Sequence, residues 1–237
     1  MLNEFQGSSK SNIIQPEVVH NKQHFDDFYG GDKIKLKFKE IIEFLREPNK
    51  YEKMGARIRR GVLLYGPPGT GKTMLARALA NESGCEFIRV VPSEFQEMFV
   101  GVGAKRVREL FASARKCPNG CIIFVDEIDA LGNRLNHLRD SHETTSTINQ
   151  FLSEMDGFSP TDRIVIVAAT NRIDLVDHAV LRAGRFDIKV PVDLPCFEER
   201  KGIFSKLVAI KCRSYEIPAD TINEVAVRSE SWSGADL

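Results

Sequence analysis

The feature that most constrains this chain is a glycine-rich stretch at residues 66–73, Gly-Pro-Pro-Gly-Thr-Gly-Lys-Thr. The stretch matches the phosphate-loop pattern G-x-x-x-x-G-K-[ST] at every fixed position. An apolar run at 62–65 precedes it and predicts a buried strand, and an Ala- and Leu-rich run at 74–81 predicts a helix. A strand, a turn and a helix N-terminus in this order direct backbone N–H groups at one point and favour an anion there. The alternative is a Gly/Pro turn with an incidental lysine, which would leave both matching flanks unexplained.

Side chains inside and beyond this loop predict how a bound phosphate chain is handled. Lys72 is expected to reach the β- and γ-phosphates, and Thr73 Oγ is expected to ligate Mg²⁺. Asp126 and Glu127 follow the continuous apolar run 121–125, which is typical of a strand covered on both faces. Because the ends of parallel strands form the ligand crevice, Asp126 is predicted to hold Mg²⁺ through water. Glu127 is predicted to reach the water that attacks the γ-phosphate; without the phosphate loop, this Asp-Glu pair would suggest only a solvated turn.

Composition limits the class of protein. The chain has 237 residues, 42% of them apolar, with 33 basic and 33 acidic side chains, so its formal net charge is zero. A balanced charge argues against nucleic acid as the main partner. No apolar run approaches the length of a membrane span, so none is expected in this chain. Five scattered cysteines suit free thiols in a reducing compartment.

The order of predicted elements indicates an α/β fold. Predicted strands alternate with helices as far as about residue 195, which implies a parallel sheet with helices on both faces. After that point only helices are predicted, at about 197–208 and 219–229. A polar loop is expected at 132–143. We therefore divide the chain into a flexible segment 1–22, an α/β domain 23–195 and a partial helical lid 196–237.

Three further polar residues follow the later predicted elements. Asn171 ends the fourth predicted strand, where its amide could orient a water or contact the γ-phosphate; a turn-forming Asn is the alternative. Arg182 and Arg185 flank a turn at Gly184. An exposed arginine is usually a surface charge, but this turn could project a guanidinium toward a neighbouring subunit as an arginine finger. Arg185 is the preferred candidate, because the apolar Phe186 after it would fix its direction.

These segments resemble the motifs of AAA+ ATPases of the classical AAA clade, and within it the membrane-anchored FtsH/i-AAA proteases. The resemblance covers about residues 25–237. Its most specific parts are Walker A at 66–73, Walker B at 122–127, sensor 1 at 168–171, the finger segment at 182–187 and the sensor 2 region at 234–236. Residues 97–104, Glu-Met-Phe-Val-Gly-Val-Gly-Ala, match the substrate-gripping pore loop, and parts of 147–158 match the inter-subunit signalling segment.

The resemblance implies an α/β P-loop NTPase with a parallel five-stranded sheet in the order 5-1-4-3-2, followed by the helical lid. It implies ATP and Mg²⁺ as cofactors. It also implies a set of residues that contact the nucleotide or its Mg²⁺: Phe28, Tyr29, Gly30, Pro68, Gly69, Thr70, Gly71, Lys72, Thr73, Met74, Asp126, Gly234 and Ala235. The implied pore residues are Phe99, Val100 and Gly101, although a Met-Phe-Val run is more often buried core.

The same resemblance implies a hexameric ring of AAA subunits that threads unfolded protein, and a location at the mitochondrial inner membrane or a bacterial-type membrane, of which the mitochondrial one is preferred. Residues 142–146, His-Glu-Thr-Thr-Ser, are the nearest approach to the zinc motif H-E-x-x-H and lack its second His, so no peptidase site is expected in this chain. Two alternatives remain: a nucleotide-binding fragment with little activity, and a non-proteolytic remodeller of protein complexes. Four positions depart from the family pattern: Thr145, Ile173, His178 and Ala183.

Overall fold

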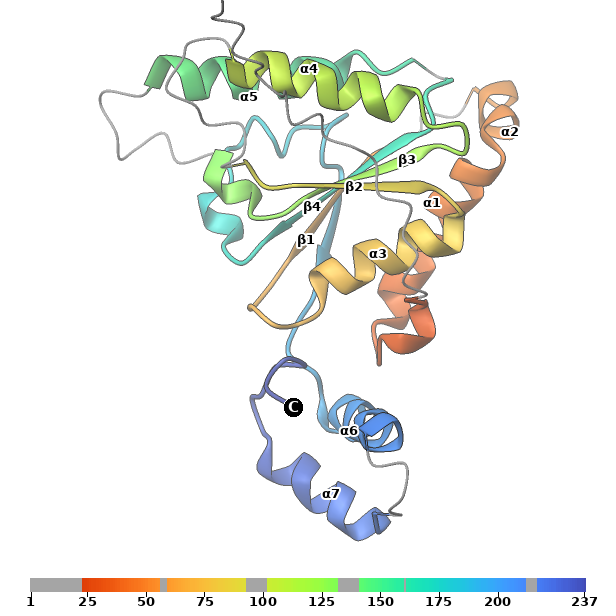
Figure 1. Cartoon of the computed structure of the whole chain (residues 1–237), viewed down its shortest axis with the longest axis vertical. Coiled ribbons are helices and arrows are strands. Elements are labelled where there is room, and N and C mark those ends of the chain that lie inside the picture. The colour runs from red at the N-terminus through yellow and green to blue at the C-terminus, as the bar shows by residue number, and fades with distance from the viewer. Residues whose placement is uncertain (1–22, 56–58, 93–101, 132–140, 160, 212–216) are drawn as a thin grey trace, which may run out of the picture.

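The computed structural model describes residues 23–55, 59–92, 102–131, 141–159, 161–211 and 217–237. A five-stranded sheet in the order β2-β3-β4-β1-β5 lies at its centre, and every neighbouring pair is parallel (Figure 1). The predicted order 5-1-4-3-2 is thus confirmed. The strands are β1 Gly61–Tyr65, β2 Glu86–Val90, β3 Cys121–Val125, β4 Ile164–Thr170 and β5 Ile188–Pro191.

The central strands are buried on both faces. All residues of β3 and β4 are buried, as their continuous apolar sequences predict for strands sandwiched between helices. Figure 1 shows α1, α2 and α3 toward one side of the sheet and α4 and α5 across the other. These helices span α1 Asp32–Arg46, α2 Pro48–Lys53, α3 Lys72–Ser83, α4 Val102–Arg115 and α5 Ser141–Asp156.

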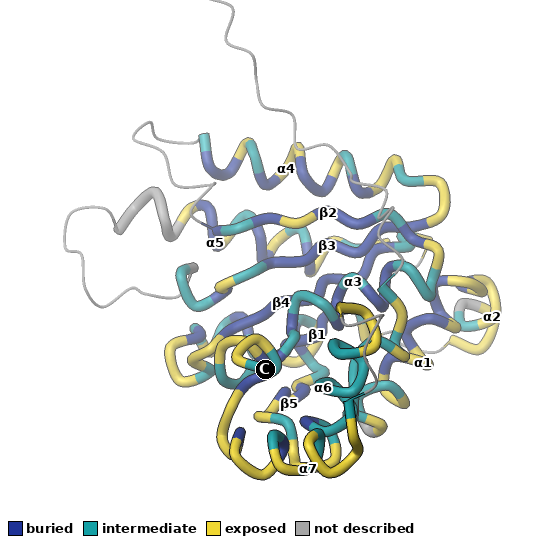
Figure 2. The backbone as a smooth tube through the Cα atoms, turned by 60° about the horizontal axis from the view of Figure 1, so that its bottom comes forward, coloured by how far each residue is buried: buried dark blue, intermediate teal, exposed yellow. Residues whose placement is uncertain are grey.

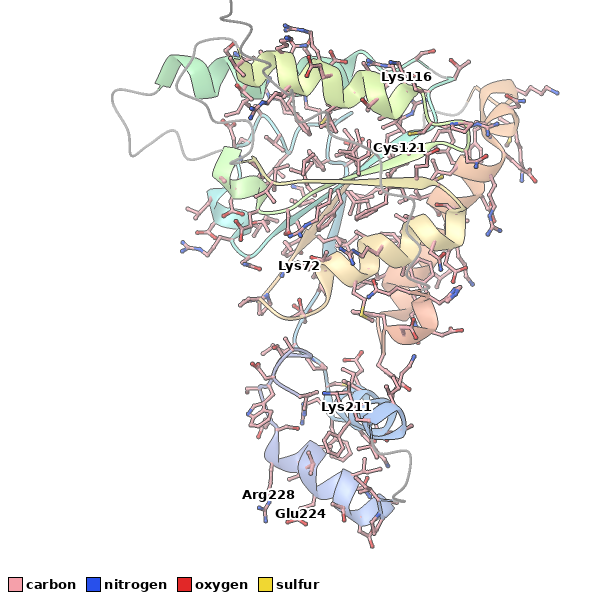
Figure 3. All side chains as sticks on the ribbon, in the orientation of Figure 1. Lys72, Lys116, Cys121, Lys211, Glu224 and Arg228 are labelled. Carbon is pink, nitrogen blue, oxygen red and sulfur yellow. The ribbon has the colours of Figure 1, made fainter. Side chains whose placement is uncertain are left out.

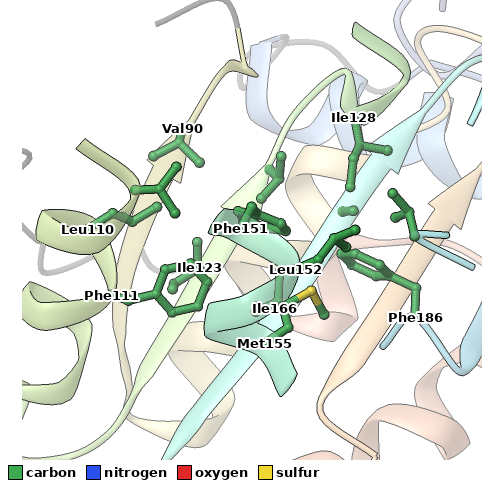
Figure 4. Packing of buried hydrophobic residues seen from close by; sticks show 14 of the residues in the cluster. Val90, Leu110, Phe111, Ile123, Ile128, Phe151, Leu152, Met155, Ile166 and Phe186 are labelled. Atoms are coloured by element: carbon green, nitrogen blue, oxygen red, sulfur yellow. The ribbon is translucent and has the colours of Figure 1, made fainter. Parts of the chain in front are cut away.

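Two apolar clusters hold these layers together. On the side of α1 and α3, Phe38, Ile41 and Leu45 recur at helical spacing and pack with the sheet. On the side of α4 and α5, the ring of Phe111 meets that of Phe151 edge-on, with centroids 5.5 Å apart (Figure 4). Figure 2 shows that burial is concentrated in the sheet and on the inward faces of the helices.

The lid is a separate pair of helices beyond β5, α6 Phe197–Lys211 and α7 Ala219–Arg228 (Figure 1). Arg200 joins the two helices from inside. Its Nε and Nη2 donate to Ala226 O at 3.1 and 2.9 Å, and its Nη1 donates to Pro195 O at 2.9 Å. A buried arginine with all these partners is a fixed element of the lid rather than a surface charge.

Some boundaries differ from the sequence expectations. Pro48 starts α2, because proline fits the first position of a helix and has no N–H to lose there. The predicted loop 132–143 overlaps α5, which begins at Ser141; the rest of that loop and the segment 1–22 lie outside the described residues. The part of the chain that the structure describes also contains the short 3-10 helices η1 Phe25–Asp27, η3 Ile128–Leu131 and η4 Ile173–Leu175.

Phe111 offers a test of the α4–α5 core. It is fully buried, and its ring meets Phe151 and also Phe158, whose centroid is 5.8 Å away. Phe111→Ala is expected to lower the free energy of unfolding by about 3–5 kcal/mol, measured by urea denaturation. Glu109→Ala on the exposed side of the same helix is the control and should change it by no more than about 0.5 kcal/mol. A loss below about 1 kcal/mol for Phe111→Ala would contradict this packing.

Candidate nucleotide site

The glycine-rich loop connects β1 to α3 and is closely surrounded by backbone. Gly66 N donates to Thr170 O at 3.3 Å, and Gly66 has φ 149°, where a Cβ would lie 2.1 Å from Val192 O. Gly69 has φ 74°, and a Cβ there would lie 2.4 Å from Ser233 Oγ. Only glycine fits at these two positions. The loop is therefore shaped by the ends of β4 and β5 and by the C-terminal turn.

Lys72 is the first residue of α3 and lies beside the loop (Figure 3). Its side chain is buried, and Nζ donates to Gly66 O at 2.9 Å and to Pro67 O at 2.7 Å. Burial lowers the pKa of this amine, while the negative charge of Asp126 acts in the opposite direction. The first turn of α3 contains no acidic residue, so its N–H groups and helix dipole remain suited to an anion.

Asp126 follows β3 at the same edge of the sheet. Its N–H donates to Val90 O at 3.0 Å, which fixes the chain as it leaves the strand. Its Oδ2 accepts a hydrogen bond from Arg89 Nη2 at 2.7 Å. A role for Arg89 was not predicted from the sequence. The sequence shows only a charged residue near the end of a predicted strand, and it does not show that this strand lies beside the one that precedes Asp126.

Glu127 has a left-handed backbone, with φ 54°. This conformation is uncommon and strained for a residue other than glycine, and such strain is frequent at functional sites. The residue is exposed, and among the described residues its carboxylate has no hydrogen bond or ion pair. The structure thus presents a free carboxylate at the end of β3, one residue beyond Asp126.

A hydrogen bond links the end of β4 to the turn after β3. Thr170 Oγ1 donates to Asp129 Oδ1 at 2.6 Å and accepts from Arg172 N at 2.9 Å. Asn171 lies between these contacts and is exposed, and its amide has no hydrogen bond to another described residue. Neither Thr170 nor Asp129 was predicted as a site residue, although Thr170 precedes Asn171 and Asp129 lies two residues after Glu127. Together they connect the chain around Asn171 to the turn that begins at Glu127.

A cavity of about 1020 Å³ lies between the loop, the segment before α1, the end of β5 and helix α6. The Phe28 ring closes against the loop: a Cβ at Gly71 would lie 3.1 Å from it. The Tyr29 ring packs on Gly202 of α6, where a Cβ would lie 2.3 Å from the ring. Eight of the predicted nucleotide contacts line this cavity: Phe28, Tyr29, Gly69, Thr70, Gly71, Met74, Gly234 and Ala235.

The remaining predicted contacts lie around the cavity or loop. Gly30 adjoins Tyr29, and a Cβ there would collide with the Glu199 carboxylate. Pro68 belongs to the loop itself, and Thr73 follows Lys72 in the first turn of α3. The predicted pore residues Phe99, Val100 and Gly101 lie outside the described residues.

The C-terminal turn contacts the loop directly. Ala235 N donates to Gly69 O at 3.2 Å. The turn itself is held by Asp236, whose Oδ2 accepts from Ser233 N at 2.8 Å and from Ser233 Oγ at 2.7 Å. The predicted contacts Gly234 and Ala235 are therefore placed beside the phosphate loop, more than 160 residues along the chain from it.

The two arginines of the finger segment differ in environment. Arg185 forms a two-pronged ion pair with Asp156, with Nε–Oδ1 at 3.0 Å and Nη2–Oδ2 at 2.7 Å, and Nη1 donates to Ala179 O at 2.6 Å. These hydrogen bonds hold the pKa of the Asp156 carboxyl below its ordinary value. Arg182 is exposed, and its guanidinium contacts no described acidic side chain or carbonyl. Arg185 is thus held within its own chain.

Within the described ranges, no helix combines the length and the apolar character that crossing a bilayer requires.

Comparison with known proteins places these features in a family. The family described as "ATPase family associated with various cellular activities (AAA)" matches residues 62–194. The chain is 49% identical over 213 residues to the ATP-dependent zinc metalloprotease FtsH 2 of Sphaerobacter thermophilus, covering 90% of this chain and 32% of that protein. It is 48% identical over 236 residues to FtsH 3 of the same species, covering 100% of this chain and 46% of that protein. It is 46% identical over 236 residues to FtsH of Bacillus subtilis, covering 98% and 36%.

The chain thus spans 32–46% of the length of these curated relatives. The expectation of a mitochondrial location is wrong, because these relatives, which match nearly the whole chain, are bacterial proteins. The matched segment extends from β1 past β5, so it includes the phosphate loop, the Asp-Glu pair and Asn171. The chain belongs to the AAA family of ATPases and is similar throughout the described residues to the ATPase part of FtsH.

Proposed function

We propose that this chain binds ATP with Mg²⁺ between the phosphate loop and the lid and hydrolyses it to ADP and phosphate. The observation that carries the proposal is that the charge of Asp126, the residue before Glu127, acts on the Lys72 amine, while Thr70 and Gly71 of the same loop line a cavity of about 1020 Å³. The fold supplies the cation, the metal-side carboxylate and a free carboxylate next to it. Phosphoryl transfer to water requires these groups in this arrangement.

The residues present fit the nucleotide and its metal. Glycines at 66 and 69 fit the loop closely against Val192 and Ser233, and because they carry no side chains they leave the backbone N–H groups of the loop open to a phosphate. The rings of Phe28 and Tyr29 supply apolar surface for a base. Thr73 and Asp126 would hold Mg²⁺, the latter through water, and the bound ion would neutralise charge that develops on the phosphates.

Each residue has a distinct task in this proposal. Lys72 exchanges its loop carbonyls for phosphate oxygens. Glu127 positions the attacking water and accepts its proton, and Asn171 orients that water or the γ-phosphate. Arg185 would complete the site of a neighbouring subunit, for which it must leave Asp156. Arg182, which is exposed on the same turn, is the second candidate for that contact.

The assembled activity is also a proposal. A hexameric ring that threads unfolded protein past Phe99, Val100 and Gly101 is the assembly that agrees with the similarity to FtsH, and those longer proteins are named ATP-dependent zinc metalloproteases. A second candidate is a chain that binds nucleotide but turns it over slowly when alone. The pairing of Arg185 with Asp156 favours this second candidate for isolated chains, because it leaves the finger occupied.

Lys72→Ala should weaken ATP binding roughly tenfold or more, because it removes a charged hydrogen-bond donor from the phosphates. The affinity is measured by isothermal titration calorimetry with Mg²⁺ present. Lys116→Ala, which removes an exposed lysine after α4, is the matched control and should bind ATP as the parent does. An unchanged affinity for Lys72→Ala would refute the phosphate-loop assignment.

Glu127→Gln should keep ATP affinity within about twofold while lowering the hydrolysis rate by roughly 10²–10⁴. The change removes the proton acceptor but keeps the size of the side chain. Phosphate release and ATP binding are measured on the same preparation. Glu224→Gln, on the exposed side of α7, is the control. Near-normal turnover by Glu127→Gln would mean that another group positions the water.

Turnover per chain should rise steeply with protein concentration if Arg185 acts on a neighbour. Arg185→Ala should then reduce turnover by roughly 10³–10⁵ with little change in ATP affinity. Mixing Arg185→Ala chains with Glu127→Gln chains should restore part of the activity, because each supplies what the other lacks. High specific activity that stays constant down to concentrations at which the chain is monomeric would exclude a finger supplied in trans.

A further inference from the structure

Arg89 contacts the metal-side carboxylate from the edge of the sheet. It lies on β2 opposite Phe124 of β3, two residues before Asp126. Phe87 of β2 and Phe124 both pack in the cluster on the side of α1 and α3, and their rings stack with centroids 5.9 Å apart. Since side chains alternate along a strand, Arg89 shares this face and lies on the side of the sheet where the phosphate loop starts α3.

The guanidinium is aimed at the strand end. Arg89 Nη2 lies 2.7 Å from Asp126 Oδ2, and the side chains are 46% and 21% exposed, respectively. A charged residue on an edge strand commonly serves only to prevent pairing with another sheet. Here the Arg89 guanidinium instead contacts Asp126, a predicted site residue, so a role of Arg89 in ligand binding can be tested.

Asp126 therefore has two cations near it before any metal arrives. Arg89 donates a hydrogen bond to one oxygen of Asp126. The negative charge of Asp126 also acts on the Lys72 amine, which is the second cation. A divalent ion held through water by Asp126 would share this carboxylate with Arg89 and would be repelled by the guanidinium. Without a metal, the same guanidinium would still add positive charge beside Asp126, and this charge would favour an anionic nucleotide.

We propose that Arg89 is a positioning residue that holds one oxygen of Asp126 and thereby reduces the dependence of nucleotide binding on Mg²⁺. The inference rests on the proposed function, since it presumes that ATP and Mg²⁺ meet at Asp126. Removing the Arg89 charge should lower nucleotide affinity in the absence of metal. The increase in affinity that Mg²⁺ produces should then be larger than in the parent. For a partly exposed ion pair the expected change is about three- to tenfold.

The test compares nucleotide affinity with and without metal. The affinity for a fluorescent N-methylanthraniloyl ATP is titrated in excess Mg²⁺ and in excess EDTA, and the ratio of the two dissociation constants (EDTA over Mg²⁺) gives the metal dependence. Arg89→Gln should raise this ratio about three- to tenfold over the parent. Arg89→Lys keeps the charge and should stay within about twofold of the parent.

A matched control separates this role from a structural one. Arg115 forms a comparable ion pair, with Nη2 2.9 Å from Glu154 Oε2, between α4 and α5. Arg115→Gln should leave the ratio unchanged. A purely structural role of Arg89 would shift the urea unfolding midpoint of Arg89→Gln and leave its ratio within twofold of the parent, and that result overturns the inference.

The two proposals fail in different ways. If the parent chain binds the analogue, and Lys72→Ala weakens that binding, the nucleotide-binding part of the proposed function stands whatever Arg89→Gln does. If the parent binds the analogue neither with Mg²⁺ nor with EDTA, the proposed function falls and the role of Arg89 falls with it. A ratio that rises equally in Arg89→Gln and Arg89→Lys would reject charge as the cause.

Discussion

The parallel pairing of β4 with both β1 and β3 is the constraint on which the site depends. Every residue of β4 is buried, and its register with the two neighbours is continuous. Because all three strands run in one direction, their carboxyl ends meet at one edge of the sheet. The phosphate loop, the Asp126–Glu127 pair and Asn171 are therefore neighbours, although they come from distant parts of the chain. The burial of these apolar strands thus determines where the polar residues that follow them lie.

Much of this arrangement could be predicted from sequence. The runs 62–65 and 121–125 are short, apolar and bounded by polar or glycine residues, so their assignment to β1 and β3 was accurate to about one residue. The position of the phosphate loop followed from a motif whose glycines have no substitutes in this backbone. The order of the strands came from the family resemblance, since periodicity alone does not specify which strands are neighbours.

Pairings between distant side chains could not be predicted. Arg89 with Asp126, Thr170 with Asp129 and Arg185 with Asp156 each join residues between 29 and 41 positions apart. Such contacts depend on which strands lie side by side and on the direction of each side chain, and neither is encoded locally. Arg185 illustrates the consequence: its turn was located correctly, but its guanidinium bonds within its own chain, and its role toward a neighbour stays a prediction.

The hydrogen bond from Ala235 N to Gly69 O connects the lid to the phosphate loop through backbone atoms alone. Both groups belong to the main chain, so the link needs no particular side chain at position 235 except that proline would remove the N–H, whereas position 69 must remain glycine. The hydrogen bond couples the position of the loop to the position of the C-terminal turn of the lid. Any displacement of Gly69 must either lengthen this bond or carry the C-terminal turn with it. A movement of the loop would then be passed to the lid through Gly69 O and Ala235 N, with no side chain in between.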